Sequence, residues 1–334
     1  MAWEKREASL EELKGARVLL TGGAGFIGIA LARRLAGVAE TVIFDALPAD
    51  ALRDRLAAAD VDSEFQTGDV RLQSDVAKAA AGCTHILHLA SVAGVDSVMS
   101  RPLETMEVIS EGTLNVLRVA EKLTGFKRLV NFSTSEVFGD MAFKLSEGEP
   151  TALGAVGQSR WTYAVSKLMA EHLVYNYHKV RGLPAASIRP FNIYGPGQIG
   201  EGAIHHFVKC AIKAEDLTIH NDGTQIRAWC YIDDLVEGVL LALTLDAAVG
   251  HSFNIGNPRS TITIYNLARE IKDLAGSESE IKFVDWPFQD IDLRVPNIDK
   301  ARATLGFAPQ VELRDGIIKT IDWYRDKLGR GAAH

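Results

Sequence analysis

The chain has 334 residues, of which 36 are basic and 43 acidic, and its formal net charge is −7. With 47% hydrophobic and 24% charged residues, it is composed like a globular protein with a substantial core. No block of one charge sign stands out, which argues against a nucleic-acid surface, and no apolar run approaches the roughly 20 residues that span a membrane.

Apolar periodicity predicts the elements in chain order. Ser9 and Glu12 have the spacing of a capping box and predict a short leading helix. Five apolar runs then predict strands at residues 17–21, 40–45, 64–68, 85–90 and 128–133. Helical patterns lie between them, notably at 26–36 and 103–123. Apolar strands that alternate with helices indicate a parallel sheet covered on both faces, so we predict an α/β, doubly wound Rossmann fold.

The pattern becomes less regular after about residue 190, where prolines and glycines interrupt it, and it ends in an amphipathic helix at 313–328. We expect a dinucleotide-binding domain of residues 14–190, to which about 222–255 return. Residues 191–221 and 256–330 are expected to form a smaller C-terminal domain that caps the strand ends and binds the substrate.

Three cysteines, Cys83, Cys210 and Cys230, are far apart and lack the spacing of a metal site. The first 15 residues are charged and have no apolar centre, unlike a signal peptide. We therefore expect a cytoplasmic protein with reduced, mostly buried thiols and no bound metal.

A glycine pattern follows the first predicted strand. Gly22, Gly25 and Gly28 open the next helix, where glycines allow backbone amides to approach a pyrophosphate and the helix terminus adds positive potential. Asp45 ends the second strand, and its carboxylate can accept hydrogen bonds from ribose hydroxyls and would repel a 2′-phosphate. We therefore expect NAD rather than NADP. Asp69, after the third strand, is expected to contact the adenine or to cap the following helix.

Tyr163 and Lys167 form Y-x-x-x-K, in which the two side chains share one face of a helix. We expect Lys167 and the nicotinamide ring to favour the phenolate, so that Tyr163 removes a hydroxyl proton while a hydride leaves to NAD. Thr134, Ser135 and Glu136 follow the fifth strand, at the sheet edge where ligands bind, although hydroxyl residues also serve as caps there.

These motifs resemble the extended short-chain dehydrogenase/reductases, the NAD-dependent epimerase/dehydratase family, over nearly the whole chain. TGGAGFIG, GDV, LHLAS, STSEVFG, YAVSK, RPFNIYGP and YIDD occur in the family's order. The resemblance implies bound NAD, a nucleoside-diphosphate sugar as substrate, and a homodimer formed through the helices near 103–123 and 162–180. The residues expected to bind the cofactor are Gly22, Gly25, Phe26, Ile27, Gly28, Asp45, Asp69, Val70, Leu89, Ala90, Tyr163 and Lys167.

Three features look like UDP-glucuronate decarboxylases in particular: the T-S-E of residues 134–136, the pair Arg160 and Trp161, and the segment 293–298. By resemblance, Arg294 lies near the sugar carboxylate, Asn192 contacts substrate and Arg227 binds the diphosphate. The T-S-E form also looks like GDP-mannose 4,6-dehydratases.

The expected reaction starts with oxidation of the sugar C4 hydroxyl by the redox pair, with Thr134 bonded to the same oxygen. Decarboxylation of UDP-glucuronate would follow, with the carboxylate held by Arg294 and Ser135 and a C5 proton handled by Glu136. The alternatives are an NDP-sugar 4-epimerase, then an NDP-hexose 4,6-dehydratase. A non-catalytic NAD-binding regulator is a remote alternative, because such proteins usually lose the tyrosine or the lysine.

Overall fold

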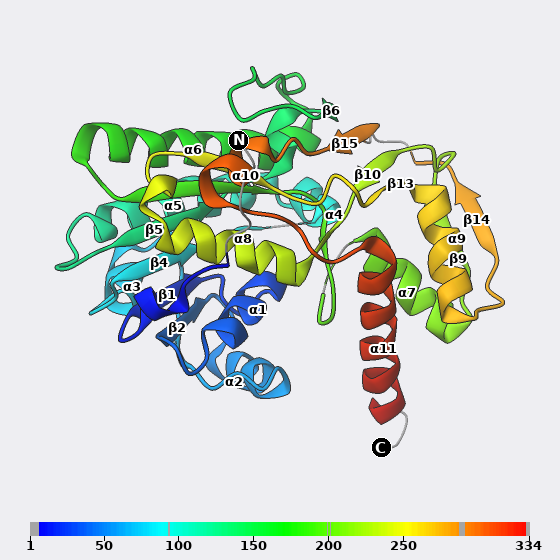
Figure 1. Cartoon of the computed structure of the whole chain (residues 1–334), viewed down its shortest axis with the longest axis horizontal. Helices are drawn as coiled ribbons and strands as arrows, with labels where there is room; N and C mark the ends of the chain where they lie inside the picture. Colours follow the sequence, from blue (N-terminus) through cyan, green and yellow to red (C-terminus); the bar gives the residue numbers. More distant parts are fainter. Residues whose placement is uncertain (1–6, 93, 199, 201, 287–290, 332–334) are drawn as a thin grey trace.

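The computed structural model describes the chain except residues 1–6, 93, 199, 201, 287–290 and 332–334. Figure 1 shows a large sheet wrapped by helices, with a smaller group of helices and short strands beside it. The strands are β1 (Arg17–Thr21), β2 (Glu40–Asp45), β3 (Glu64–Thr67), β4 (His85–His88), β5 (Arg128–Phe132), β6 (Met141–Phe143), β7 (Ala185–Pro190), β8 (Ile193–Tyr194), β9 (Leu217–His220), β10 (Ile226–Ala228), β11 (Cys230–Tyr231), β12 (Ser252–Ile255), β13 (Thr261–Thr263), β14 (Ile281–Val284) and β15 (Leu293–Val295). The α-helices are α1 (Phe26–Leu35), α2 (Ala49–Ala58), α3 (Gln73–Ala79), α4 (Val95–Ser100), α5 (Pro102–Ala120), α6 (Thr162–Arg181), α7 (Ala203–Lys213), α8 (Ile232–Thr244), α9 (Ile264–Ala275), α10 (Asp299–Leu305) and α11 (Leu313–Gly331). Short 3₁₀ turns are η1 (Leu10–Leu13), η2 (Ser135–Phe138), η3 (Ser159–Trp161) and η4 (Asp246–Ala248).

The large sheet has seven parallel strands in the order β12-β7-β5-β4-β1-β2-β3. The chain runs from β1 to one edge and then returns to build the other side from β4, so the strand order reverses between β1 and β4. This arrangement confirms the predicted doubly wound α/β fold and creates the crevice at which such sheets bind ligands.

Alternate residues of β1 show why both faces of the sheet are covered. Val18 and Leu20 pack into the core cluster that includes residues of α1 and α8, whereas Leu19 packs into the cluster that includes α3, α5 and α6. All three side chains are fully buried. A continuous apolar run is therefore the pattern that a strand between two helical layers requires.

The smaller sheet has the order β13-β10-β15-β6, in which β10 pairs antiparallel with β13 and parallel with β15. Its strands come from distant parts of the chain, and β6 precedes the redox helix α6. The later strand β12 pairs with β7 in the large sheet. The expected domain boundaries stay a prediction, since the two sheets share these interleaved segments.

The prediction of a capping box at Ser9 and Glu12 is wrong. Residues Leu10–Leu13 form only a 3₁₀ turn, and the side chain of Ser9 makes no capping hydrogen bond. The segment is held instead by the amide of Ala8, which donates to Glu237 on α8 at 2.5 Å. The other predicted elements are present, with ends that differ by at most three residues, which is ordinary at frayed termini.

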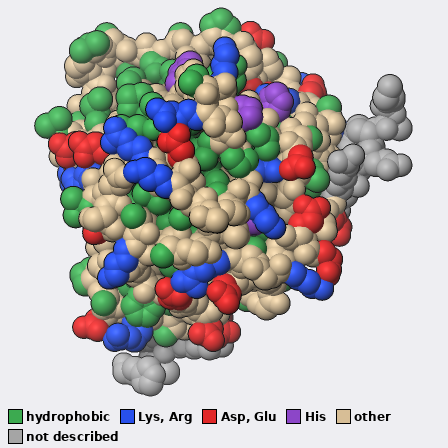
Figure 2. All heavy atoms as spheres, turned by 90° about the vertical axis from the view of Figure 1, so that its left-hand side faces the viewer, with side chains coloured by type: hydrophobic (Ala, Val, Ile, Leu, Met, Phe, Trp, Pro, Cys, Tyr) green, Lys and Arg blue, Asp and Glu red, His purple; other side chains and the backbone are tan. Residues whose placement is uncertain are grey.

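The three cysteines lie in the interior of the protein. Cys83, Cys210 and Cys230 are buried and unbridged, as predicted. Within the described part of the chain, no helix has both the length and the apolar character needed to cross a bilayer. On the face at the left of Figure 1, apolar side chains form several groups interspersed with basic and acidic ones (Figure 2).

Candidate active site

The main cavity lies along the carboxyl ends of the large sheet's strands and has a volume of about 910 Å³. Its lining comes from the loops after β1, β2, β4, β5 and β7, and from α6 and β15. The cavity therefore occupies the crevice that the strand order creates.

The loop between β1 and α1 brings its backbone unusually close to neighbouring segments. Gly22 has a φ of +66°, and a Cβ there would lie 2.8 Å from the Cα of Ala90. A Cβ on Gly28 would lie 2.4 Å from the carbonyl oxygen of Gly23, so no side chain fits. Gly25 is the N-cap of α1 and lines the cavity, which directs the positive end of this helix towards it. The loop fits a pyrophosphate group.

Every residue that the sequence predicts to bind the cofactor lines this cavity: Gly22, Gly25, Phe26, Ile27, Gly28, Asp45, Asp69, Val70, Leu89, Ala90, Tyr163 and Lys167. Their individual contacts with a ligand stay predictions.

The two aspartates also have structural partners. Asp45 accepts hydrogen bonds from the amides of Ala24 (3.1 Å) and Leu47 (3.2 Å), so it ties the glycine loop to the end of β2. Asp69 accepts from the Arg71 amide at 2.9 Å and forms an ion pair with the Arg71 guanidinium at 2.6 Å. Asp69 does not cap α3, whose N-cap residue is Leu72. Of the two roles expected for Asp69, the position at the cavity wall favours contact with the adenine.

Tyr163 and Lys167 lie one turn apart on α6. The Lys167 Nζ donates to the carbonyl oxygen of Phe132 at 2.8 Å and lies 5.7 Å from the centroid of the Tyr163 ring. The hydroxyls of Ser91 and Thr134 hydrogen-bond the Tyr163 side chain. A phenol, an ammonium group and two hydroxyls thus converge at one wall of the cavity.

Burial dominates the electrostatics of this pair. It raises the pKa of the Tyr163 phenol and the charge of Glu136 raises it further, while the bonds with Ser91 and Thr134 oppose the rise without cancelling it. Burial lowers the pKa of the Lys167 ammonium to about 7. The expectation that Lys167 and the nicotinamide ring together favour the phenolate stays a prediction.

The residues after β5 lie beside the redox pair. Thr134 caps η2, since its Oγ1 accepts from the Glu136 amide at 3.2 Å, and Ser135 is buried beside it. The Glu136 carboxylate accepts from Arg160 at 2.6 and 3.2 Å, and it lies 3.6 Å from the Arg294 guanidinium. All five residues line the cavity.

The two residues expected to contact substrate by resemblance are placed differently. Asn192 lines the cavity with a φ of +42° and donates its amide to the Ala228 carbonyl at 2.8 Å. Arg227 lies on β10 in register with Arg294 and donates to the Ile226 carbonyl at 3.1 Å. Arg227 is not among the residues that line the cavity, but its register with Arg294 places it beside one of them, and its contact with a diphosphate stays a prediction.

Two further site residues enter the sequence analysis only within family motifs. Ser91 ends the run LHLAS and reaches the Tyr163 phenol, but a single serine after a strand carries no signal of its own. Arg160 enters the analysis only through a resemblance, and its ion pair with Glu136 links residues 24 positions apart.

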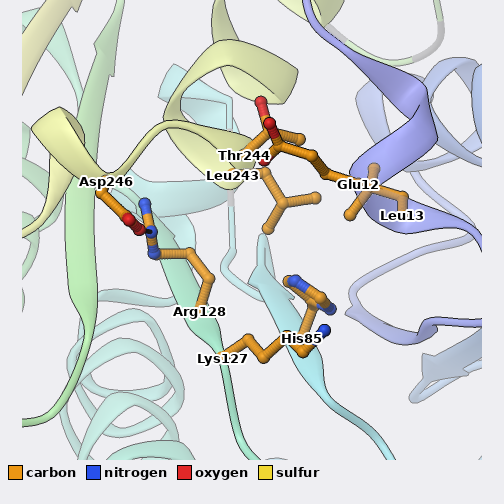
Figure 3. A pocket seen from close by; sticks show the side chains of 8 residues that line it. All are labelled: Glu12, Leu13, His85, Lys127, Arg128, Leu243, Thr244 and Asp246. Carbon is orange, nitrogen blue, oxygen red and sulfur yellow. Dashed lines mark hydrogen bonds and ion pairs between the residues drawn. The ribbon is translucent and has the colours of Figure 1, made fainter.

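A second cavity of about 480 Å³ lies at the opposite edge of the sheet, where β4 and β5 begin (Figure 3). Arg128 donates there to the carbonyls of Ala242 and Leu245 and to the carboxylate of Asp246, so it ties the end of α8 to the sheet. Burial lowers the pKa of neighbouring His85 to about 4. None of the predicted site residues lines this cavity, and Arg128 has a structural role in it.

Comparison with known proteins identifies the family. The model of the NAD dependent epimerase/dehydratase family matches residues 18–256. The chain belongs to this family. Its cofactor is NAD, and the glycine loop and the carboxylate of Asp45 fit that dinucleotide.

Individual relatives within the family differ in their reactions. The UDP-N-acetyl-alpha-D-glucosaminuronate decarboxylase of Bacillus cytotoxicus is 31% identical, over 93% of this chain and 98% of that protein. UDP-glucuronic acid decarboxylase 1 of Xenopus tropicalis is 35% identical, over 96% of this chain and 74% of that protein. The UDP-glucuronic acid 4-epimerase of Bacillus cereus, solved with UDP-glucuronic acid and NAD, superposes with a TM-score of 0.83 at 27% identity, covering 93% of this chain and 99% of that one.

Proposed function

We propose that this protein is an NAD-dependent decarboxylase of a nucleoside-diphosphate uronate, with UDP-glucuronate as the substrate. The observation that carries the proposal is that Arg294, 3% exposed, lines the same cavity as Tyr163 and Lys167. A guanidinium at the wall of the cavity can bind a carboxylate, which a uronate has at C6 and a neutral hexose lacks. The two curated relatives described above are both named as decarboxylases, which supports the same choice.

The redox pair prepares C4 for the reaction. NAD, when bound, accepts the C4 hydride and places a positively charged ring at this wall of the cavity. Tyr163 removes the proton of the C4 hydroxyl, while Thr134 donates a hydrogen bond to the same oxygen. Lys167 stays anchored on the Phe132 carbonyl and keeps its ammonium beside the phenol.

Residues beside the redox pair carry out the loss of carbon dioxide. Arg294 and Ser135 hold the C6 carboxylate out of the plane of the sugar ring. Once C4 is a ketone, the carboxylate is β to it, so breaking the C5–C6 bond leaves an enolate whose charge lies on the C4 oxygen. Tyr163 and Thr134 stabilise that oxygen as the charge develops. Glu136, near the same group, passes to C5 a proton that it takes from solvent.

A 4-epimerase is the second candidate function. It is favoured by the similarity to the Bacillus cereus UDP-glucuronic acid 4-epimerase, and it would use the same redox pair. It needs only that the 4-keto sugar turn in the cavity and retain its carboxylate. A 4,6-dehydratase would instead need Glu136 to remove the C5 proton. A non-catalytic NAD-binding regulator would have no use for the intact redox pair.

We also propose that the protein is a homodimer through α5 and α6, which pack on each other. Apolar side chains remain exposed on both helices, with Met106 at 41%, Val165 at 43% and Met169 at 41%. Pairing with a second copy would remove this apolar surface from water. Light scattering should report a dimer for the wild type and a monomer for Val165→Glu combined with Met169→Glu.

The reaction is tested by proton NMR of the purified protein with NAD and UDP-glucuronate. Carbon dioxide release with appearance of pentose or 4-keto pentose signals is the expected result, and Tyr163→Phe should abolish it while still binding NAD. Conversion to UDP-galacturonate with the carboxylate intact would refute decarboxylation and establish the epimerase.

A further inference from the structure

The segment that follows β7 forms the side of the cavity away from the cofactor loop. Ile193, Gln198 and Gly200 of this segment line the cavity. In the large sheet, β7 lies on one side of β5, whereas the glycine loop and the two aspartates lie at the ends of β1, β2 and β3 on the other side. Lys167 is anchored between them, on the last residue of β5. The segment therefore borders the part of the cavity that the expected cofactor residues leave to a second ligand.

The C-terminal helix α11 holds this segment at two places. The Tyr194 hydroxyl donates to the Leu313 carbonyl at 3.2 Å, and Gly316 makes room for it, since a Cβ there would lie 2.1 Å from the Tyr194 oxygen. Further along the helix, the Tyr324 hydroxyl donates to the backbone carbonyl of Gln198 at 2.5 Å. These bonds join residues 119 and 126 positions apart. In Figure 1, α11 stands beside α7, which begins just after the segment.

Tyr324 is in turn held by a histidine of α7. The His205 Nδ1 lies 2.5 Å from the Tyr324 hydroxyl oxygen. Because the hydroxyl has one proton and gives it to Gln198, His205 is the donor and carries its proton on Nδ1. Burial keeps both groups neutral: it raises the pKa of Tyr324 to about 12, and it lowers the pKa of His205 to about 4, which the charges of Lys209 and His206 lower further. A directed chain of hydrogen bonds thus runs from α7 through α11 to the wall of the cavity.

Gln198 is held less firmly by its own segment. Its amide donates to the Gly195 carbonyl at 3.3 Å and its side chain to the Ile193 carbonyl at 3.4 Å, and both bonds are long. Gly197, immediately before it, has a φ of +81°, and glycine has more conformational freedom to lose on folding than any other residue. Within the described part of the chain, the bond from Tyr324 is the shortest that Gln198 makes.

We infer that Tyr324 and His205 are positioning residues that fix Gln198 and so preorganise the substrate side of the cavity. The inference rests on the proposed function, because it needs a sugar nucleotide in this part of the cavity. A wall that is ordered before binding costs little to order on binding, whereas a loosened wall must lose its freedom when the ligand arrives. Loss of this chain of bonds should therefore weaken binding of the sugar nucleotide. Binding of NAD should be preserved, since its expected residues lie elsewhere in the cavity.

The test compares the affinities for two ligands. UDP-glucuronate is titrated calorimetrically into the NAD-loaded Tyr163→Phe protein, which cannot turn the substrate over, and NAD is titrated into the nucleotide-free protein. Adding Tyr324→Phe, which removes only the hydroxyl, should weaken UDP-glucuronate binding about 3- to 10-fold and leave NAD binding within about 2-fold. His205→Ala should weaken UDP-glucuronate binding in the same way, and His205→Asn, whose amide can donate in place of Nδ1, should restore most of the affinity.

Tyr265→Phe is the matched control. Tyr265 is 39% exposed on α9, and its hydroxyl makes no hydrogen bond to the residues that the structure describes. Removing this hydroxyl should change neither affinity.

The outcomes separate the inference from the proposed function. Unchanged UDP-glucuronate affinity in Tyr324→Phe, or an equal loss for both ligands, overturns the inference even where the wild type decarboxylates UDP-glucuronate. If Tyr324→Phe does not fold, the two His205 variants decide: tighter UDP-glucuronate binding with asparagine than with alanine supports the inference, and equal binding overturns it. A parent protein that binds UDP-glucose but not UDP-glucuronate refutes the proposed uronate, and the same variants then test the inference with UDP-glucose. A parent that binds neither overturns both.

Discussion

Replacing the buried lysine of the redox pair should stabilise the nucleotide-free protein while it abolishes turnover. Burial lowers the pKa of Lys167 from its ordinary 10.5 to about 7. The unfolded chain therefore binds more protons than the folded one between about pH 7 and pH 10.5, and by linkage this costs the folded state roughly 4 kcal/mol at pH 7. Lys167→Met removes that cost but leaves the Phe132 carbonyl without its 2.8 Å donor, a loss of about 1–3 kcal/mol. We expect a net gain of about 1–3 kcal/mol in the free energy of unfolding at pH 7.

The pH dependence has a definite sign. Because the folded pKa of Lys167 is depressed, the wild type gains stability as pH rises from 7 towards 10, whereas Lys167→Met does not, so the advantage of the variant should vanish over that range. Urea unfolding of both proteins at several pH values in this window measures the difference. Lys179→Met, at an exposed lysine of the same helix, is the control and should show no such trend. A variant that is less stable at pH 7, or a difference that does not change with pH, would refute the reasoning.

Two further predictions concern the cofactor loop and the core. Gly28→Ala should weaken NAD binding at least about 10-fold in a fluorescence titration, because the new Cβ would lie 2.4 Å from a backbone oxygen. Gly148→Ala is the control and should leave the affinity for NAD unchanged, because nothing lies within 4 Å of a Cβ at that position. Glu171→Gln should cost about 3–5 kcal/mol of stability at neutral pH, measured by urea unfolding, because it removes the negative charge that compensates the buried guanidinium of Arg189, 2.7 Å away. Burial raises the pKa of the Glu171 carboxyl, but Arg189 outweighs this effect, so the pKa is lowered. The stabilisation should therefore be present above the ordinary carboxyl pKa and be lost as pH falls. Equal stability of variant and wild type at pH 7 would contradict the prediction.

The large sheet is predictable because burial on both faces leaves a continuous apolar run in the sequence. The strand Arg17–Thr21 is an example, with four of its five residues buried. The smaller sheet has no comparable signal. Its strands β6, β10, β13 and β15 have three residues each, and β6 pairs with a segment about 150 positions later in the chain. Such short strands are stabilised by the partners they meet in the folded chain, which no local pattern reveals.

The site is predictable as a set of residues but not as a set of interactions. Motif spacing places Tyr163 beside Lys167, since i and i+4 share a helix face. It says nothing about the sign of the pKa shift at the phenol, which depends on how completely the surrounding chain excludes water. Nor does it reveal that Glu136 is held by Arg160, because that contact joins residues 24 positions apart that only the folded chain brings together. An attraction between two side chains can be predicted from their spacing, whereas the loss of solvation on burial cannot.

Glu136 couples the redox pair electrically to the carboxylate site that we propose beside it. Its negative charge raises the pKa of Tyr163, so the phenol senses the charge of its neighbours. In the proposed reaction, loss of carbon dioxide leaves the electron pair of the C5–C6 bond in an enolate, so the negative charge moves from the carboxylate to the C4 oxygen beside Tyr163 and Thr134. Hydrogen bonds from these two hydroxyls would stabilise the charge where it arrives, which favours decarboxylation of the 4-keto intermediate.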